Sequence, residues 1–236
     1  MGPGALSGEP RRSYSSSMIV ALCLGVGLAG LAAGWFLAPA AERYTGELGT
    51  RHRTVTAACA GLVSAALALR FGAHPVLVAY LYFGIVCTLL TFIDLAVQRL
   101  PDPYTLPAYL AGPLLLAAAA PFTEQGFPRL VYGLIGLAAL WLVYGAQHFL
   151  LPDAIGRGDV KLAGVLGLYL GWAGWASVVV GWFAAFLLGG LFAVGLLAAR
   201  RAGRKSSVPF GPWMLAGAWI GLIAGDAVWD WYRALL

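Results

Sequence analysis

Charged residues are scarce in this chain. Only 11% of its 236 residues are Asp, Glu, Lys or Arg, and 61% are hydrophobic, whereas a typical soluble domain carries about 25% charged residues. A soluble globular fold is therefore excluded, and a polytopic membrane protein embedded in a lipid bilayer is predicted. The net charge of +5 reflects which loops hold Lys and Arg, so no nucleic-acid partner is expected.

Cysteine is also scarce. The three cysteines, Cys23, Cys59 and Cys87, all lie inside apolar runs and show no CxxC spacing, which argues against a disulfide framework and against a zinc site. The three histidines, His52, His74 and His148, are too scattered to form a ligand set, and packing or interfacial roles are expected for them. We therefore expect neither a metal nor a cofactor.

Long apolar runs dominate the rest of the chain. Residues 1–17 are polar and rich in Gly, Pro and Ser, and are predicted to be a disordered tail. Residues 18–236 are predicted to form one transmembrane domain with an all-α fold. The apolar runs predict about eight transmembrane helices, at roughly 18–41, 54–70, 75–97, 104–121, 129–151, 159–174, 175–199 and 209–229. The sixth and seventh are separated only by the GWAGW turn.

Lys and Arg are distributed unequally between alternate loops. With these spans, one side of the membrane holds ten of them and the other side five, which places the first set in the cytoplasm. The ten are Arg43, Arg51, Arg53, Arg99, Arg157, Lys161, Arg200, Arg201, Arg204 and Lys205, and the five are Arg11, Arg12, Arg70, Arg129 and Arg233.

Two aspartates lie where an apolar run meets polar sequence. Asp94 closes the run LYFGIVCTLLTFID, and Asp159 opens a later run in GRGDVKLAGVLG. An ionisable residue at the edge of a span is a functional candidate by default. Both acids fall on the cytoplasmic side and at the same depth, so we predict that they meet as an acid/base pair that activates water.

Two other acids compete with this pair. Asp102 and Asp153 neighbour prolines, in RLPDP and LLPDA, and turn or capping roles are expected for both. Asp102 is predicted to lie in a loop rather than in a span.

The second candidate acid belongs to a GxGD sequence. Gly156 and Gly158 flank Arg157 and would let a substrate backbone approach Asp159 closely, and Lys161 is near. Taken alone, the same four residues are also typical of a Gly turn with an Asp helix cap.

Three stretches together resemble the type IV prepilin peptidase family. They are FIDLAVQRLPDPYTLP, GRGDVKLAGVLGLYLGW and VPFGPWMLAGAWIGL, in this order at the boundaries of successive spans, over about residues 75–225. The resemblance implies a metal-free, integral-membrane aspartic endopeptidase with Asp94 and Asp159 as the catalytic pair and Gly156 and Gly158 shaping the loop. Asp102 and the Pro209–Pro212 segment match the motifs without an assigned role.

The resemblance also implies the substrate. Members of this family cut a short basic leader from pilin-like precursors, after the Gly that precedes their apolar helix, at the cytoplasmic face of the membrane. The expected partners are prepilin or pseudopilin precursors of a type IV pilus or a protein secretion system, and the expected location is the bacterial inner membrane.

One feature departs from the family pattern. Many members carry a large cytoplasmic insertion after the first span, with paired CxxC motifs and N-methyltransferase activity. Here the corresponding loop is only about residues 42–53 and contains no cysteine, and so short a loop cannot fold as a domain. Peptidase activity without methyl transfer is expected.

Two other functions remain open. A protease of the presenilin or signal peptide peptidase type also uses GxGD, but such proteins carry Tyr before the first Asp and a late Pro-Ala-Leu motif, where this chain has Ile93 and Val208-Pro209-Phe210. A transporter with membrane carboxylates would place its acids nearer the middle of the spans.

Glycines recur at GxxxG spacing in three runs, at Gly30 and Gly34, at Gly167 and Gly171, and at Gly217, Gly221 and Gly225. Small residues at this spacing let helix backbones approach closely. The helices that they join could belong to one chain or to a homodimer, and the sequence does not choose.

Overall fold

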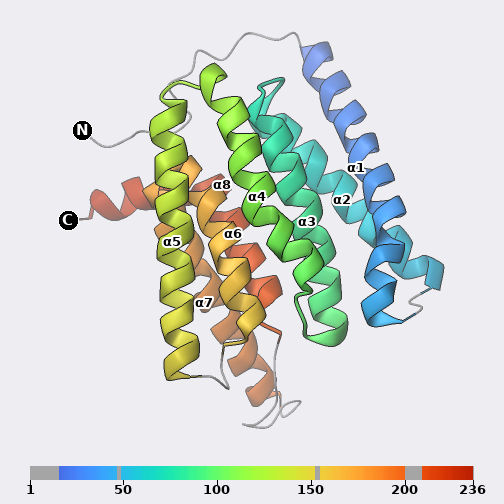
Figure 1. Cartoon of the computed structure of the whole chain (residues 1–236), viewed down its shortest axis with the longest axis vertical. Coiled ribbons are helices and arrows are strands. Elements are labelled where there is room, and N and C mark those ends of the chain that lie inside the picture. The colour runs from blue at the N-terminus through green and yellow to red at the C-terminus, as the bar shows by residue number, and fades with distance from the viewer. Residues whose placement is uncertain (1–15, 47–48, 152–154, 200–208, 236) are drawn as a thin grey trace. The chain divides into compact units, whose positions relative to one another are not determined.

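The computed structural model describes residues 16–46, 49–151, 155–199 and 209–235, and the regular structure in these ranges is entirely helical (Figure 1). This confirms the all-α prediction. Residues 1–15 of the tail predicted over residues 1–17, Asp153 and the basic residues within 200–205 lie outside the described residues. The helices are α1 (Ser16–Thr45), α2 (Gly49–Phe71), α3 (Val76–Val97), α4 (Asp102–Ala119), the 3-10 turn η2 (Ala120–Phe122), α5 (Gly126–Leu150), α6 (Arg157–Ala173), α7 (Trp175–Ala198) and α8 (Gly211–Arg233).

Six of these helices are long and apolar enough to cross a membrane, namely α1 to α5 and α7. Eight spans are predicted, and the other two helices, α6 and α8, do not meet this criterion for different reasons. Helix α6 has only 17 residues, and α8 contains four tryptophans and three charged residues. A multi-pass membrane protein is thus supported, while the crossing of the membrane by α6 and α8 stays a prediction.

Glycine and proline mark the helix boundaries. Gly174 has φ of +142°, a conformation that side chains disfavour, so α6 and α7 are separate helices across the GWAGW turn. At the end of α3, Gln98 adopts the left-handed conformation and its N–H donates to the Asp94 carbonyl. Pro101 then caps α4 in an extended conformation, as proline does at helix starts.

The chain forms two compact units, which we call the N-terminal unit, within Ser7–Phe127, and the C-terminal unit, within Pro128–Leu236. In the N-terminal unit α1 packs along α2, and α3 contacts α1, α2 and α4. Helices α1 and α2 approach closely at Gly30 and Gly34; an added Cβ at Gly34 would lie 2.8 Å from the Cα of Ala57. That these units form one domain stays a prediction.

In the C-terminal unit α6 contacts α5, α7 and α8. Helices α5 and α6 touch at Gly136, where a Cβ would lie 2.4 Å from the Gly167 carbonyl oxygen. Helices α7 and α8 touch in the same way at Gly217, 2.5 Å from the Gly181 carbonyl oxygen. The glycines at GxxxG spacing are therefore used for helix contacts inside this chain. A homodimer stays a prediction, and these glycines no longer support it.

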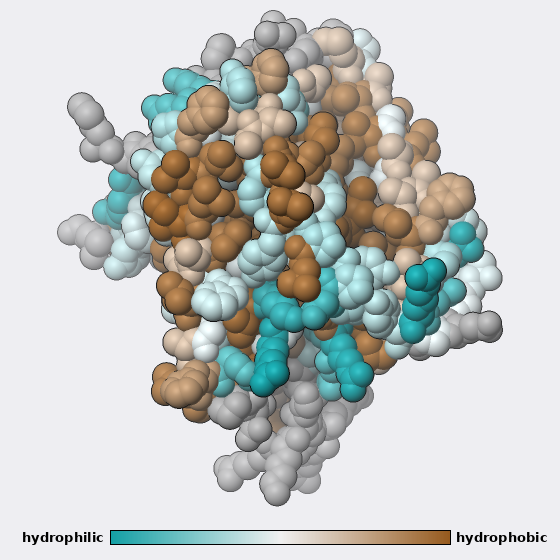
Figure 2. Space-filling model, in the orientation of Figure 1, coloured by the Kyte–Doolittle hydropathy of each residue, from teal (hydrophilic) through white to brown (hydrophobic). Residues whose placement is uncertain are grey.

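The outer surface of the helices is apolar. Large hydrophobic side chains such as Leu28, Phe36, Leu110 and Phe183 are more than half exposed, and hydrophobic residues cover much of the face drawn in Figure 2. Such a surface is stable against lipid tails.

Candidate active site

Asp159 lies in the first turn of α6, where the unpaired N–H groups of the helix end and its dipole favour a carboxylate. Its Oδ2 accepts a hydrogen bond of 3.0 Å from the N–H of Gly156, the residue that caps the helix. A Cβ on Gly156 would lie 3.2 Å from this same Oδ2. Its φ of −74° suits any residue, so a larger side chain at this position would act through the Asp159 carboxylate, which would have to shift by a few tenths of an ångström.

His148 bonds to the loop that leads into this turn. Its Nδ1 lies 2.6 Å from the carbonyl oxygen of Ile155. A carbonyl oxygen only accepts, so Nδ1 carries the proton and donates. The sequence predicts no more than a packing role for His148, because the residues that it joins are separated by a loop and carry no recognisable spacing.

The remaining residues of the GxGD region lie on the same helix. Arg157 and Gly158 precede Asp159 in the first turn of α6, and Lys161 follows with a partly exposed side chain. The structure therefore brings Gly156, Gly158, Asp159 and Lys161 together at one helix end.

Asp94 lies in the last turn of α3 and is buried, with 4% of its surface exposed. Its backbone carbonyl closes the helix end by accepting from Gln98 N–H at 2.9 Å. Two residues earlier, Phe92 meets the ring of His52 edge-on, with 5.2 Å between ring centroids. The start of α2 thus packs against the turn of α3 that carries Asp94.

The same end of α2 is fixed to α1 by Arg53. Its Nε donates a hydrogen bond of 2.8 Å to the carbonyl of Trp35, and its guanidinium lies 4.3 Å from the centroid of the Trp35 ring. A cation in this position is attracted by the ring face.

Asp102 is not in a loop, and this prediction is wrong. It is the first residue of α4, it is exposed, and it follows the capping Pro101. The reason is that proline suits the first turn of a helix, where its missing N–H costs nothing.

The Pro209–Pro212 segment packs into an aromatic cluster of the C-terminal unit through Phe210. The cluster comprises Tyr144 of α5, Trp182 and Phe186 of α7 and Phe210, the cap of α8. Ring centroids of Tyr144 and Phe210 are 6.3 Å apart, and those of Phe186 and Phe210 are 5.2 Å apart. This cluster fixes Phe210, and with it the Pro209–Pro212 segment, against α5 and α7.

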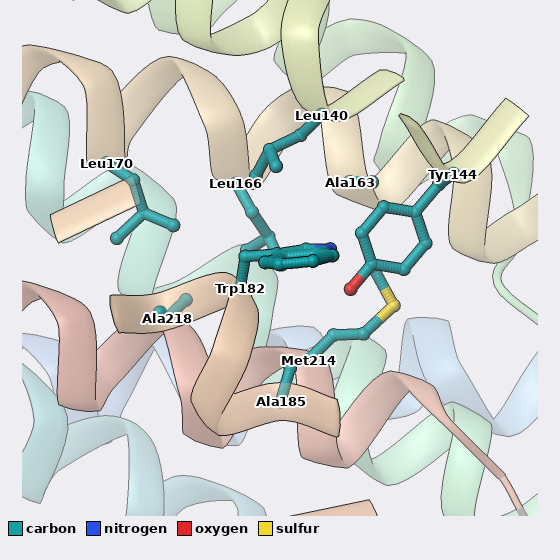
Figure 3. Close-up of a pocket in the computed structure, with 10 residues that line it drawn as sticks. Leu140, Tyr144, Ala163, Leu166, Leu170, Trp182, Ala185, Met214 and Ala218 are labelled. Carbon is teal, nitrogen blue, oxygen red and sulfur yellow. The ribbon is translucent and has the colours of Figure 1, made fainter. Parts of the chain in front are cut away.

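A cavity of about 10 Å³ is lined in part by Tyr144 and Trp182 of this cluster. Its volume is close to that of the smallest space that holds one water. Figure 3 shows the indole of Trp182 among its lining side chains, together with Leu140, Tyr144, Leu166 and Met214. So small an apolar space cannot take a peptide side chain. The cavity is a packing feature of the C-terminal unit.

Among the described residues, no group of three or more His, Cys, Asp or Glu side chains is placed to hold a metal ion. The absence of a metal or cofactor stays a prediction.

The pairing of Asp94 with Asp159 also stays a prediction. Asp94 belongs to the N-terminal unit and Asp159 to the C-terminal unit, so each acid is described with its own surroundings. What the structure establishes for both is placement in the terminal turn of a helix, the last turn of α3 for Asp94 and the first turn of α6 for Asp159.

Comparison with known proteins agrees with the motifs. Residues 81–194 match the type IV leader peptidase family. The chain is 34% identical over 150 residues to a prepilin leader peptidase/N-methyltransferase of Aeromonas salmonicida, covering 62% of this chain and 49% of that protein. It is 34% identical over 172 residues to the protein of the same name in Aeromonas hydrophila (72% and 58%), and 30% identical over 185 residues to that of Pseudomonas putida (78% and 62%).

The chain thus spans about half to three fifths of the length of these curated relatives. No solved structure matches it significantly.

Proposed function

The chain belongs to the type IV leader peptidase family, and on this premise we propose that it is a membrane-bound aspartic endopeptidase that removes the leader of prepilin-like precursors. Cleavage follows a Gly at the cytoplasmic face of the bacterial inner membrane. The catalytic residues are Asp94 and Asp159.

One observation carries this proposal. The range that matches the family, residues 81–194, contains both aspartates, and each lies in the terminal turn of its helix. Hydrolysis requires water, and a helix end lies nearer to the membrane surface than the mid-span position that the acids of a transporter would take.

The chemistry follows from two acids in different protonation states. One carboxylate takes a proton from a water as its oxygen attacks the peptide carbonyl. The other, protonated, gives its proton to the carbonyl oxygen. As the C–N bond breaks, the first acid passes the proton that it took from water to the leaving amine, and the second acid takes its proton back from a hydroxyl of the intermediate. The Gly before the cleaved bond, together with Gly156 beside Asp159, leaves room for the extended substrate backbone.

We also propose that the chain transfers no methyl group. Only residues 46–48 lie between α1 and α2, so there is no room at this point for an inserted domain. Its relatives named prepilin leader peptidase/N-methyltransferase are longer proteins.

Substitution of the acids tests the proposal. The protein and a pilin-like precursor are co-expressed, and cleavage is read by gel shift, N-terminal sequencing and the mass of the product. The wild type is expected to release the leader after Gly and to leave the new N-terminus unmethylated. Asp94→Asn and Asp159→Asn are each expected to abolish cleavage, because Asn keeps the size of the side chain but cannot act as acid or base.

Control variants decide what a loss of cleavage means. Asp102→Asn, at an exposed position, is expected to cleave, and membrane levels of every variant are measured by immunoblot. Cleavage that persists in both Asn variants of the proposed pair would contradict the assignment of these acids. A wild type that cuts no such precursor would contradict the proposed activity.

A further inference from the structure

Two hydrogen bonds near Asp159 meet on a single peptide group. The carbonyl of Ile155 and the N–H of Gly156 belong to the same peptide bond. The carbonyl accepts from His148 Nδ1 at 2.6 Å, and the N–H donates to Asp159 Oδ2 at 3.0 Å. Since a peptide group is planar, the orientation of its carbonyl also sets the direction of its N–H.

We propose that His148 is a positioning residue for Asp159, acting through the Ile155–Gly156 peptide. This inference rests on the proposed function and adds a third residue to the site. His148 does not touch the substrate. Its Nδ1–H holds the peptide plane so that the Gly156 N–H points at Oδ2 and fixes the carboxylate.

The arrangement favours this role over simple capping of α5. His148 lies in the last turn of α5, where a histidine can satisfy a free carbonyl of its own helix, but its partner is instead Ile155, seven residues further along. The Ile155 side chain is 7% exposed, so the peptide is anchored on one side by apolar packing and on the other by the imidazole. Hydrogen bonds in such a chain polarise one another, which strengthens the bond to Asp159.

Several groups besides His148 carry charge or titrate around Asp159. They are Arg157 and Lys161 on α6 and Tyr144 on α5. Both the neutral Nδ1–H form and the imidazolium of His148 donate to the carbonyl, so the proposed contact does not depend on which of the two is present.

Amide substitutions separate this role from a merely structural one. The amide nitrogen of Asn occupies nearly the place of Nδ1, whereas that of Gln lies one bond further out, near the place of Nε2. His148→Asn is therefore expected to keep most of the wild-type kcat. His148→Gln and His148→Ala are expected to lose about tenfold to a hundredfold in kcat, with the KM for the precursor unchanged.

A second readout does not depend on cleavage. Hydrogen–deuterium exchange at the Gly156 amide is expected to be faster in His148→Ala and His148→Gln than in the wild type, and unchanged in His148→Asn. The matched control is His74→Ala, because a ring nitrogen of His74 also bonds a backbone carbonyl, that of Phe122 at 2.9 Å, but in the N-terminal unit. It is expected to change neither kcat nor Gly156 exchange.

The outcomes are distinguishable from failure of the proposed function. If the wild type cuts no precursor, the peptidase proposal fails and the exchange rates alone decide the role of His148. If His148→Ala keeps wild-type exchange at Gly156, or if the Asn and Gln variants behave alike, the positioning role is overturned.

Discussion

At Asp159, one carboxylate oxygen has a structural partner. Oδ2 accepts the N–H of Gly156, and a hydrogen bond of this kind at a helix start contributes about 1 kcal/mol. The bond also limits rotation of the carboxylate. A group held in this way needs less reorganisation when it meets water and a peptide carbonyl.

Gly156→Ala tests how closely the carboxylate must be held. The added Cβ would lie 3.2 Å from Oδ2, so the carboxylate must shift by a few tenths of an ångström. We expect kcat to fall by about tenfold, equivalent to about 1.4 kcal/mol of transition-state stabilisation, with little change in the amount of folded protein. Steady-state cleavage of a precursor in detergent measures this.

The control for this substitution is Gly25→Ala in α1, where a Cβ would meet nothing within 4 Å. Its kcat is expected to equal that of the wild type. Unchanged kcat in Gly156→Ala would mean that the carboxylate does not need the position seen in the structure.

At the scale of the helices, the apolar runs and the prolines and glycines between them account for most helix boundaries. Every predicted apolar run corresponds to a helix, with ends shifted by a few residues. The start of α4 differs from the prediction, because Asp102 lies between the capping Pro101 and Pro103, which is in the first turn of the helix. Proline is favoured in that turn, so the prolines beside Asp102 are a signal for the start of a helix.

The packing of α5 against α6 depends on a direct contact between their backbones at glycines. A Cβ at Gly136 would lie 2.4 Å from the Gly167 carbonyl oxygen and 3.1 Å from the Gly171 Cα, so Gly136→Ala forces two backbones apart. We expect a loss of about 1–3 kcal/mol in stability, seen as a lower thermal unfolding midpoint in detergent. Activity should fall with it, because α6 carries Asp159.

Gly190→Ala in α7 is the matched control, because nothing lies within 4 Å of the added Cβ. Its unfolding midpoint is expected to match that of the wild type. Equal midpoints for the Gly136 and Gly190 variants would show that the α5–α6 contact contributes little to stability.

At the scale of the whole molecule, the proposed activity requires two units to cooperate. Asp94 is carried by one unit and Asp159 by the other, so neither unit holds a complete acid/base pair.

Cross-linking tests this pairing directly. Gln98 and Arg157 are exposed and lie four and two residues from the two acids, so Gln98→Cys with Arg157→Cys gives a pair of thiols near the predicted dyad. The native cysteines Cys23, Cys59 and Cys87 are first replaced by Ala. A short bis-maleimide is expected to join the two positions in membranes.

Arg157→Cys paired with Gly72→Cys provides the control. Gly72 lies at the opposite end of α3 from Asp94, so this pair is expected not to cross-link. Cross-linking of the control pair in place of the test pair would contradict an active site formed by Asp94 and Asp159.

The sequence by itself determined the solvent, the helices and the two candidate acids. This is because the cost of burying a charge in lipid depends on the local sequence. A carboxylate at the boundary of an apolar run, such as Asp94 or Asp159, can therefore be recognised without a structure. The tertiary structure decided what no spacing reveals: that His148 bonds the peptide between Ile155 and Gly156, that Phe210 packs against Tyr144, and that the glycines at GxxxG spacing face helices of the same chain. These contacts depend on which helix faces turn toward one another, and that is fixed only when the backbones pack.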